Sequence, residues 1–354
     1  MGFLDKLKNL KNKLFGNKIK ALPPAKDNKI NIPDTLEQYK VPYNVAPGSI
    51  EYAIDQYLSA LLYNRQHNEA INSYGALTSL GGLQDIKRPG NNFANESKVL
   101  NKIHNSPELY MQTQRSKNGD PCFYHISKGN HDEIKNRLYL NCRRENVASI
   151  ANELLTELKD TKSFYFKFDA DAQMQNRNRP EKFVFYLSDD PNEVNNVVQA
   201  IKNVKQRKPV LFQNSNEVMP FMKTFNGNIM YSKEPKTNVY IGLDGKPRNV
   251  AKSYNSFLAE ALNDSYLNTI QDIVARDYNL SQKVSGEIFD DSMTYTFLAL
   301  EDLMNDPNKE KSLVEGMRDK LKICMQRNPV LDIKGIDQND KKKSKVDRSF
   351  PEDK

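Results

Sequence analysis

Aromatic, basic and hydroxyl side chains that could bind or transform a phosphate gather between residues 137 and 188. The run SFYFKFD at 163–169 places Lys167 between two phenylalanines, a costly position for a lysine buried without a partner. Lysine offers a mobile charge and, when desolvated, a base, whereas arginine offers forked donors that match phosphate oxygens. These residue types suit a phosphate site. Its candidate members are Arg137, Tyr139, Asn141, Lys167, Arg177, Arg179 and Tyr186.

Alternation of apolar and polar residues predicts the strands that carry these side chains. RLYLNC at 137–142, SFYFKFD at 163–169 and KFVFYLS at 182–188 each alternate with a period of two. Amphipathic helices are predicted for ENVASIANELLTEL at 145–158 and DDPNEVNNVVQAIKNV at 189–204, the second opened by a capping Asp and a Pro. Strand, helix and strand thus follow in βαβ order.

The polar sides of the three strands are expected to share one face of the sheet. If the apolar sides pack on the two helices, Tyr165, Lys167 and Asp169 join the candidates on the opposite face, while Arg177 and Arg179 lie in the adjoining loop. Two interpretations stay open: a phosphate site, or the solvent-facing side of an open antiparallel sheet with an ordinary Lys167–Asp169 surface pair. The pattern alone favours the second.

The whole chain predicts an α+β fold, with a helical N-terminal region followed by a mixed β-sheet that carries amphipathic helices on one face. Further strands are predicted at PVLF (209–212), NIMYS (228–232) and NVYIGL (238–243), and helix near 251–275 and on to about 327. The expected divisions are a basic leader and linker at 1–26, a mainly helical region at 27–118, the α+β domain at 119–330 and a disordered charged tail at 331–354.

Composition excludes several classes of protein. The first 26 residues carry +6 of the net charge of +7, so the remainder lacks the basic footprint of a nucleic-acid binder. Cys122, Cys142 and Cys324 lack metal-site or disulfide-framework spacing, which predicts a reducing compartment and no metal centre. The sequence has no run of about 18 apolar residues, so no transmembrane helix is predicted. No secretory signal is recognised either.

Several short motifs resemble the phosphothreonine lyases and the Hop A-type family of type III effectors, relatives of which serve as the lyase component of class V lanthipeptide synthetases. In the lyases a Lys-Phe-His-Ile-Ser strand precedes a Pro-Arg-Glu-Asn helix start, a strand lysine, a loop arginine and a strand tyrosine. The matching stretches here are Arg137-Leu138-Tyr139-Leu140-Asn141, Arg144-Glu145-Asn146, Lys167 and RNRPEKFVFYLS at 177–188. The resemblance covers roughly residues 130–265.

The resemblance implies β-elimination of phosphate from phosphothreonine or phosphoserine, without metal or organic cofactor. Lys167 matches the base that removes the α-proton, which requires a neutral amine and thus a lowered pKa. Arg137, Arg179 and Tyr186 match residues that hold the leaving phosphate. Tyr139 stands where the lyases have a histidine as general acid, and a tyrosine is expected in the Hop A-type branch.

Two further positions bear on this resemblance. A Ser-Phe-Gly-x-x-Arg segment of the family corresponds to Ser253-Tyr254-Asn255 without the arginine, so Arg248 or Lys252 are the available substitutes. His125 in CFYHIS imitates the lyase strand, but Gly129 and Asn130 follow it instead of a long helix. His125 is therefore interpreted as a decoy, or as part of an adjacent strand or hairpin.

Three functions from different classes follow. The first is a phospho-Ser/Thr lyase acting on a phosphorylated protein or precursor peptide, with a kinase or a secretion chaperone as a further partner. The second is a non-catalytic effector or phosphopeptide-binding module of the same fold. The third is a membrane-surface scaffold. The expected location is the bacterial cytoplasm or, after delivery, a host cell.

The basic leader generates a prediction of its own. Residues 1–22 have apolar residues at helical spacing among lysines, typical of a helix on an anionic membrane or of a partner-docking or merely solvated leader. If the leader targets membranes, deleting residues 1–22 should abolish cosedimentation with phosphatidylserine vesicles and leave the melting temperature unchanged, because Pro23 and Pro24 separate leader from domain. Unchanged cosedimentation would contradict a membrane role.

Overall fold

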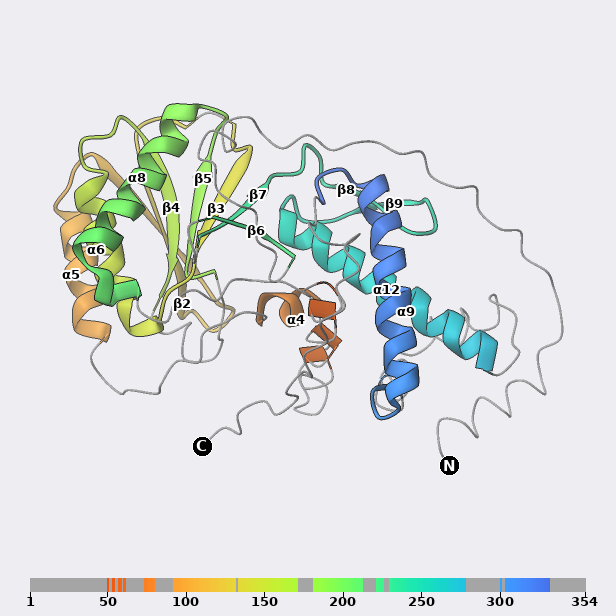
Figure 1. Cartoon of the computed structure of the whole chain (residues 1–354). Helices are drawn as coiled ribbons and strands as arrows, with labels where there is room; N and C mark the ends of the chain where they lie inside the picture. Colours follow the sequence, from red (N-terminus) through yellow and green to blue (C-terminus); the bar gives the residue numbers. More distant parts are fainter. Residues whose placement is uncertain are drawn as a thin grey trace. The chain divides into compact units, whose positions relative to one another are not determined.

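The computed structural model describes residues 73–79, 92–131, 133–170, 181–212, 221–225, 229–277, 300, 303–331 and part of 50–61. These residues belong to two compact units (Figure 1). Of the described residues, those within Thr78–Lys236 form one unit, and those within Pro47–Leu77 and Thr237–Lys354 form the other. The predicted leader at 1–26 lies outside the described residues, as does the predicted tail at 331–354 except for Leu331, which is buried.

The first unit is built on a seven-stranded sheet of order β1-β2-β4-β5-β3-β7-β6. The strands are β1 (Leu109–Arg115), β2 (Pro121–Lys128), β3 (Asn136–Leu140), β4 (Phe164–Asp169), β5 (Phe183–Leu187), β6 (Lys223–Phe225) and β7 (Ile229–Lys233). The α+β class is confirmed, but every neighbouring pair is antiparallel, whereas a mixed sheet was expected. The difference arises because β5 lies between β3 and β4, so these two parallel strands never pair.

Helices cover one face of this sheet. They are α5 (Asn92–His104), α6 (Val147–Glu157), which the one-turn η1 (Arg144–Asn146) precedes, and α8 (Pro191–Arg207). Figure 1 shows α5, α6 and α8 gathered on one side of the strands. The predicted cap is present: the Asp190 carboxylate accepts from the Asn192 N–H with Pro191 in the first turn. The shared core contains the apolar sides of all three helices and of the strands.

Phenylalanine rings on the helix-covered face of the sheet make up much of this core. Phe164, Phe166 and Phe168 of β4 and Phe183 and Phe185 of β5 are all essentially buried, with ring centroids 5.4–6.4 Å apart. Burying one such ring contributes about 1.5–3 kcal/mol. The alternation read from the sequence therefore has its apolar side on the helices, as predicted.

One predicted element was wrong, and one strand was not predicted. PVLF forms the short 3₁₀ helix η2 (Pro209–Phe212), because Pro209 follows the end of α8 and supplies no N–H to a strand ladder. Within the stretch expected to be mainly helical, Leu109–Arg115 forms strand β1, which turns through SKNGD into β2. The Asn118-Gly119 pair, with Gly119 at a φ of +86°, is a hairpin signal that explains this result.

The second unit contains the hairpin β8 (Val239–Ile241)–β9 (Pro247–Asn249) and the helices α4 (Ser73–Ser79), α9 (Tyr254–Asp277) and α12 (Pro307–Arg327). The predicted strand at 238–243 and the predicted C-terminal helices are thus confirmed. Asp264 of α9 holds the hairpin, since its carboxylate accepts from the Tyr240 hydroxyl, the Leu243 N–H and the Arg248 guanidinium. Among the described residues, no helix is both long and apolar enough to cross a membrane.

The exit from β2 provides a test of the fold. Gly129 has a φ of +70°, and a Cβ atom there would lie 2.6 Å from the Lys162 carbonyl oxygen just before β4. Gly119 has a φ of +86° with nothing within 4 Å of such an atom. Alanine in the left-handed region costs about 1–2 kcal/mol at either position. Gly129→Ala should lower the free energy of unfolding by at least about 1 kcal/mol more than Gly119→Ala in urea denaturation. Equal losses would contradict the close approach.

Candidate functional site

The polar face of the sheet brings four of the nine predicted site residues together. Across the strands β2, β4, β5 and β3, the residues His125, Lys167, Val184 and Tyr139 lie in register opposite one another. In the neighbouring row Tyr186 pairs with Arg137. Because side chains alternate along a strand, Lys167, Tyr186, Arg137 and Tyr139 all project from the face opposite the helices.

Aromatic rings and cations stack on this face. The ring centroids of Tyr165 and Tyr186 are 4.3 Å apart, and the guanidinium carbon of Arg137 lies 4.9 Å from the Tyr186 centroid. The Lys167 ammonium nitrogen lies 4.0 Å from the centroid of Phe123 on β2. A ring face attracts a cation, and this contact is one way in which the sheet accommodates the lysine between its two phenylalanines.

Arg137 is held by a carboxylate. Its Nη2 donates to Oε2 of Glu234 at 2.8 Å, and its Nε lies 2.7 Å from Oε1 of the same group. Both side chains are largely buried, 19% and 5% exposed. Burial alone lowers the pKa of Arg137, but the neighbouring Tyr139, Glu234, Tyr186 and Glu181 more than offset it and raise that pKa, so the guanidinium stays charged.

The tyrosines of the site keep their protons. Tyr139 is only 1% exposed, and its hydroxyl lies 3.1 Å from the Ser232 hydroxyl on β7. Burial raises the pKa of Tyr139 well above its usual value of 10, although the Arg137 charge opposes this. Burial likewise raises the pKa of Tyr186, again against Arg137. Each phenol is therefore a neutral hydrogen-bond donor or acceptor at neutral pH.

Burial bears on the interpretation of this face as the solvent-facing side of an open sheet. Tyr139, Asp169 and Tyr186 are buried, as are Asn141 and Glu181 nearby. A sheet face open to solvent would leave such residues exposed, so that alternative is wrong for them. In particular, Asp169 is only 1% exposed, so it is not a surface residue.

The described part of the structure does not test four of the other predicted residues. Arg177 and Arg179 lie outside the described residues, and their role stays a prediction. Arg248 belongs to the second unit, where it pairs with Asp264 and Asp244. Lys252 belongs to the same unit, so the expected role of both residues at the phosphate site also stays a prediction.

His125 is the main residue that sequence reasoning set aside. It lies on β2, so the strand or hairpin interpretation is confirmed, and it sits directly opposite Lys167. Its Nδ1 is 2.9 Å from the Tyr165 hydroxyl. Burial and the Lys167 charge lower the pKa of His125 to about 4. The alternation of CFYHIS indicated a strand, but nothing in the local sequence indicated that this strand pairs with β4.

Glu181 and Glu234 were also missed. They stand at the ends of β5 and β7, where each contributes negative charge beside Arg137 and the tyrosines. The site is thus close to charge balance before any ligand binds. Within the described ranges, no three His, Cys, Asp or Glu side chains are grouped so that they could hold a metal ion.

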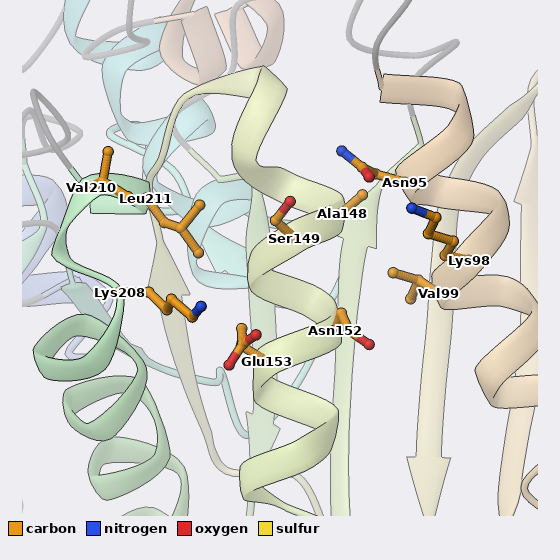
Figure 2. Close-up of a pocket in the computed structure, with 10 residues that line it drawn as sticks. All are labelled: Asn95, Lys98, Val99, Ala148, Ser149, Asn152, Glu153, Lys208, Val210 and Leu211. Atoms are coloured by element: carbon orange, nitrogen blue, oxygen red, sulfur yellow. The ribbon is translucent and has the colours of Figure 1, made fainter.

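A pocket lies away from this face (Figure 2). It measures about 430 Å³ and is bounded by α5, α6 and the segment after α8. Its lining includes Asn95, Lys98, Ser149, Glu153 and Lys208, none of which was predicted as a site residue. The pocket therefore belongs to the helical layer and is separate from the Lys167 face.

Comparison with known proteins gives one family and several structures. Residues 111–283 match the HopA1 effector protein family. The effector protein from Pseudomonas syringae pv. syringae strain 61 is 12% identical, with a TM-score of 0.42, over 62% of this chain and 89% of that one. The effector from P. syringae pv. tomato strain DC3000 is 12% identical, with a TM-score of 0.39, over 60% and 87%. The Chromobacterium violaceum VirA (SpvC) phosphothreonine lyase effector is 15% identical, with a TM-score of 0.23, over 40% and 84%. No curated protein sequence matches significantly.

The lowered pKa of His125 predicts a pH dependence of stability. Its folded value of about 4 lies below the unfolded value of about 6.5, so the unfolded chain takes up a proton that the folded chain does not. Stability should fall as the pH drops through this window. His125→Gln should lose less stability than wild type between about pH 7 and pH 4.5, measured by urea denaturation, whereas His104→Gln at the exposed end of α5 should behave as wild type. An equal loss in all three would contradict the burial of His125 as a neutral ring.

Proposed function

The chain carries a HopA1 effector family domain over residues 111–283, and from this premise we propose that it is an effector that eliminates phosphate from phosphothreonine or phosphoserine. The observation that carries the proposal is the common face on which Lys167 lies with Arg137, Tyr139 and Tyr186. An amine, a guanidinium and phenols within one cluster are the groups that such an elimination needs.

The proposed reaction assigns one task to each group. The neutral Lys167 amine takes the α-proton, the C–H electron pair forms the Cα=Cβ bond, and the Cβ–O bond breaks with its pair going to phosphate. Arg137 and Tyr186 bind the leaving phosphate, and Tyr139 or another phenol protonates it. The product is a dehydroamino acid, and the step consumes no cofactor.

Arg137 binds the phosphate by exchanging or sharing its carboxylate partner. The guanidinium is already oriented by Glu234 and by the Tyr186 ring, so less side-chain entropy is lost when an anion arrives. A phosphate dianion offers more charge than a carboxylate and the same forked geometry. The site is thereby suited to an anion that outcompetes Glu234.

A second candidate is a non-catalytic phosphopeptide-binding effector of the same fold. It is favoured by the fact that Arg137 is paired with Glu234 and the Tyr139 hydroxyl lies beside Ser232, so both groups already have protein partners. In either case we propose a phosphorylated host protein as the ligand, reached after delivery with the help of a secretion chaperone. The effector family match favours this over a precursor peptide with its kinase.

Lysine variants test the proposed chemistry. Lys167→Ala removes the base and should lower the elimination rate about 10²- to 10⁴-fold while phosphothreonine peptide still binds. Lys167→Arg should not restore the rate, because guanidinium does not lose its proton at usable pH. The measurement is dehydrobutyrine formation by mass spectrometry, with the exposed Lys162→Ala as matched control. Full activity of Lys167→Ala would reject Lys167 as the base.

Arg137 provides the complementary prediction. Arg137→Ala should weaken phosphopeptide binding as well as turnover, and the loss should be larger at low salt, because the contact is charge-assisted. The affinity is measured by fluorescence anisotropy at two salt concentrations. Unchanged affinity would place the phosphate elsewhere. If the wild type binds the phosphopeptide but eliminates no phosphate, the non-catalytic binding effector replaces the lyase as the proposed function.

A further inference from the structure

His125 and Tyr165 form a hydrogen-bonded chain beside Lys167. The His125 Nδ1 is 2.9 Å from the Tyr165 hydroxyl, and its Nε2 is 3.2 Å from the amide oxygen Oε1 of Gln114 on β1. This series of hydrogen-bonded side chains therefore crosses three strands, β1, β2 and β4. Tyr165 is two residues from Lys167 on the same side of β4, and His125 is opposite Lys167.

The partners of His125 fix its tautomer. An amide oxygen only accepts hydrogen bonds, so Nε2 carries the ring proton and donates it to Gln114. In the neutral ring Nδ1 is then bare and accepts the Tyr165 O–H. The hydroxyl hydrogen of Tyr165 is thus turned toward His125 in the protein without ligand.

Tyr165 is better placed than Tyr139 to meet a ligand. It is half-buried, whereas Tyr139 is almost fully buried. Its ring stacks on Tyr186, which lies under the Arg137 guanidinium. A phosphate bound by Arg137 and Tyr186 would therefore reach the edge of Tyr165.

We propose that His125 is the source of the proton that the leaving phosphate receives, and that the Tyr165 hydroxyl passes it on. This inference rests on the lyase function proposed above. It differs from the assignment by resemblance, which gives the general-acid role to Tyr139. Gln114 acts as a positioning residue that holds the imidazole.

The transfer balances in protons, and the site returns to its starting form once Lys167 releases the α-proton to solvent. On ligand binding His125 takes a proton at Nδ1, which then donates to the Tyr165 oxygen and frees the hydroxyl hydrogen for a phosphate oxygen. As Lys167 takes the α-proton and the Cβ–O bond breaks, Tyr165 gives its proton to the departing oxygen and recovers one from His125 Nδ1. His125 is left neutral with its proton on Nε2, the tautomer described above.

Lys167 and His125 are electrostatically coupled in the direction that this transfer needs. A charge on Lys167 lowers the pKa of His125, which burial has already lowered. The imidazolium is therefore tolerated while Lys167 is neutral and phosphate is bound, and it becomes more acidic when Lys167 gains the α-proton. The two residues then share one positive charge through the reaction.

The other groups that face His125 do not replace these partners. On its own face, β1 contributes the uncharged Gln112 and Gln114, and β2 contributes Phe123 and Ser127. Among the described residues, the titratable or charged groups that remain are Tyr110 on β1, Tyr165 and Lys167 on β4 and, one shell further, Tyr186, Arg137 and His131. Asp169 lies one step along β4, opposite Phe123.

Histidine NMR tests the protonation directly, without requiring turnover. The full chain has four histidines, so ¹⁵N-histidine spectra are simple and His125→Gln identifies the signals of interest. With no ligand, His125 should stay neutral with its proton on Nε2 between about pH 5 and 8. Saturating inorganic phosphate should raise its titration midpoint by at least about one pH unit, and Tyr165→Phe should reduce that shift. A midpoint that phosphate does not move overturns the proposal.

Kinetics on a phosphothreonine peptide test the catalytic role. His125→Gln and Tyr165→Phe should each lower kcat about 10²-fold or more with little change in KM, and His125→Gln should lose the fall in rate at high pH that wild type shows. His104→Gln should behave as wild type. If His125→Gln eliminates phosphate at the full rate, the proton transfer through His125 and Tyr165 is rejected, but the lyase function is not. Phosphate-coupled protonation of His125 in a wild type that eliminates nothing rejects the lyase function, and with it the relay's catalytic role.

Discussion

The alternation of phenylalanines in β4 and β5 is the constraint on which the site depends. Phe164, Phe166 and Phe168 face α6 and α8 with the rings of β5, and all are essentially buried. A slip of one residue would move these rings to the other face and carry the polar residues into the core, at a cost of many kcal/mol. Packing of the rings therefore fixes Lys167 and Tyr186 on a common face before any functional interaction is considered.

Charge balance then decides what that face can bind. Arg137 is compensated by Glu234, and Lys167 lies over the Phe123 ring and opposite a neutral His125. A largely buried cation without a partner would destabilise the fold, so the Glu234 carboxylate is a condition of placing Arg137 on this face. The phosphate ester that we propose as ligand matches the forked geometry that Arg137 offers to a carboxylate and carries more charge.

The sequence predicted what is local and missed what depends on strand pairing. The period of two gave the faces of β3, β4 and β5, and the helical period with its Asp190 cap gave α6 and α8. The insertion of β5 between β3 and β4 has no local signal, because pairing joins residues far apart in the chain. His125 was set aside for the same reason: Gly129 and Asn130 after it argued against a lyase strand, while its position beside Lys167 comes only from the β2–β4 register. Arg248 and Lys252 belong to the other unit. Spacing in the sequence could not show whether they reach the site.

The central claim is that this face performs elimination. The most direct measurement is ³¹P NMR of a phosphothreonine peptide incubated with the wild-type chain, followed by mass analysis of the peptide. The account predicts that inorganic phosphate appears in step with a dehydrobutyrine-containing peptide. Phosphate release that leaves threonine in the peptide would mean hydrolysis, and a peptide that keeps its phosphate would mean binding alone. Either result contradicts the account.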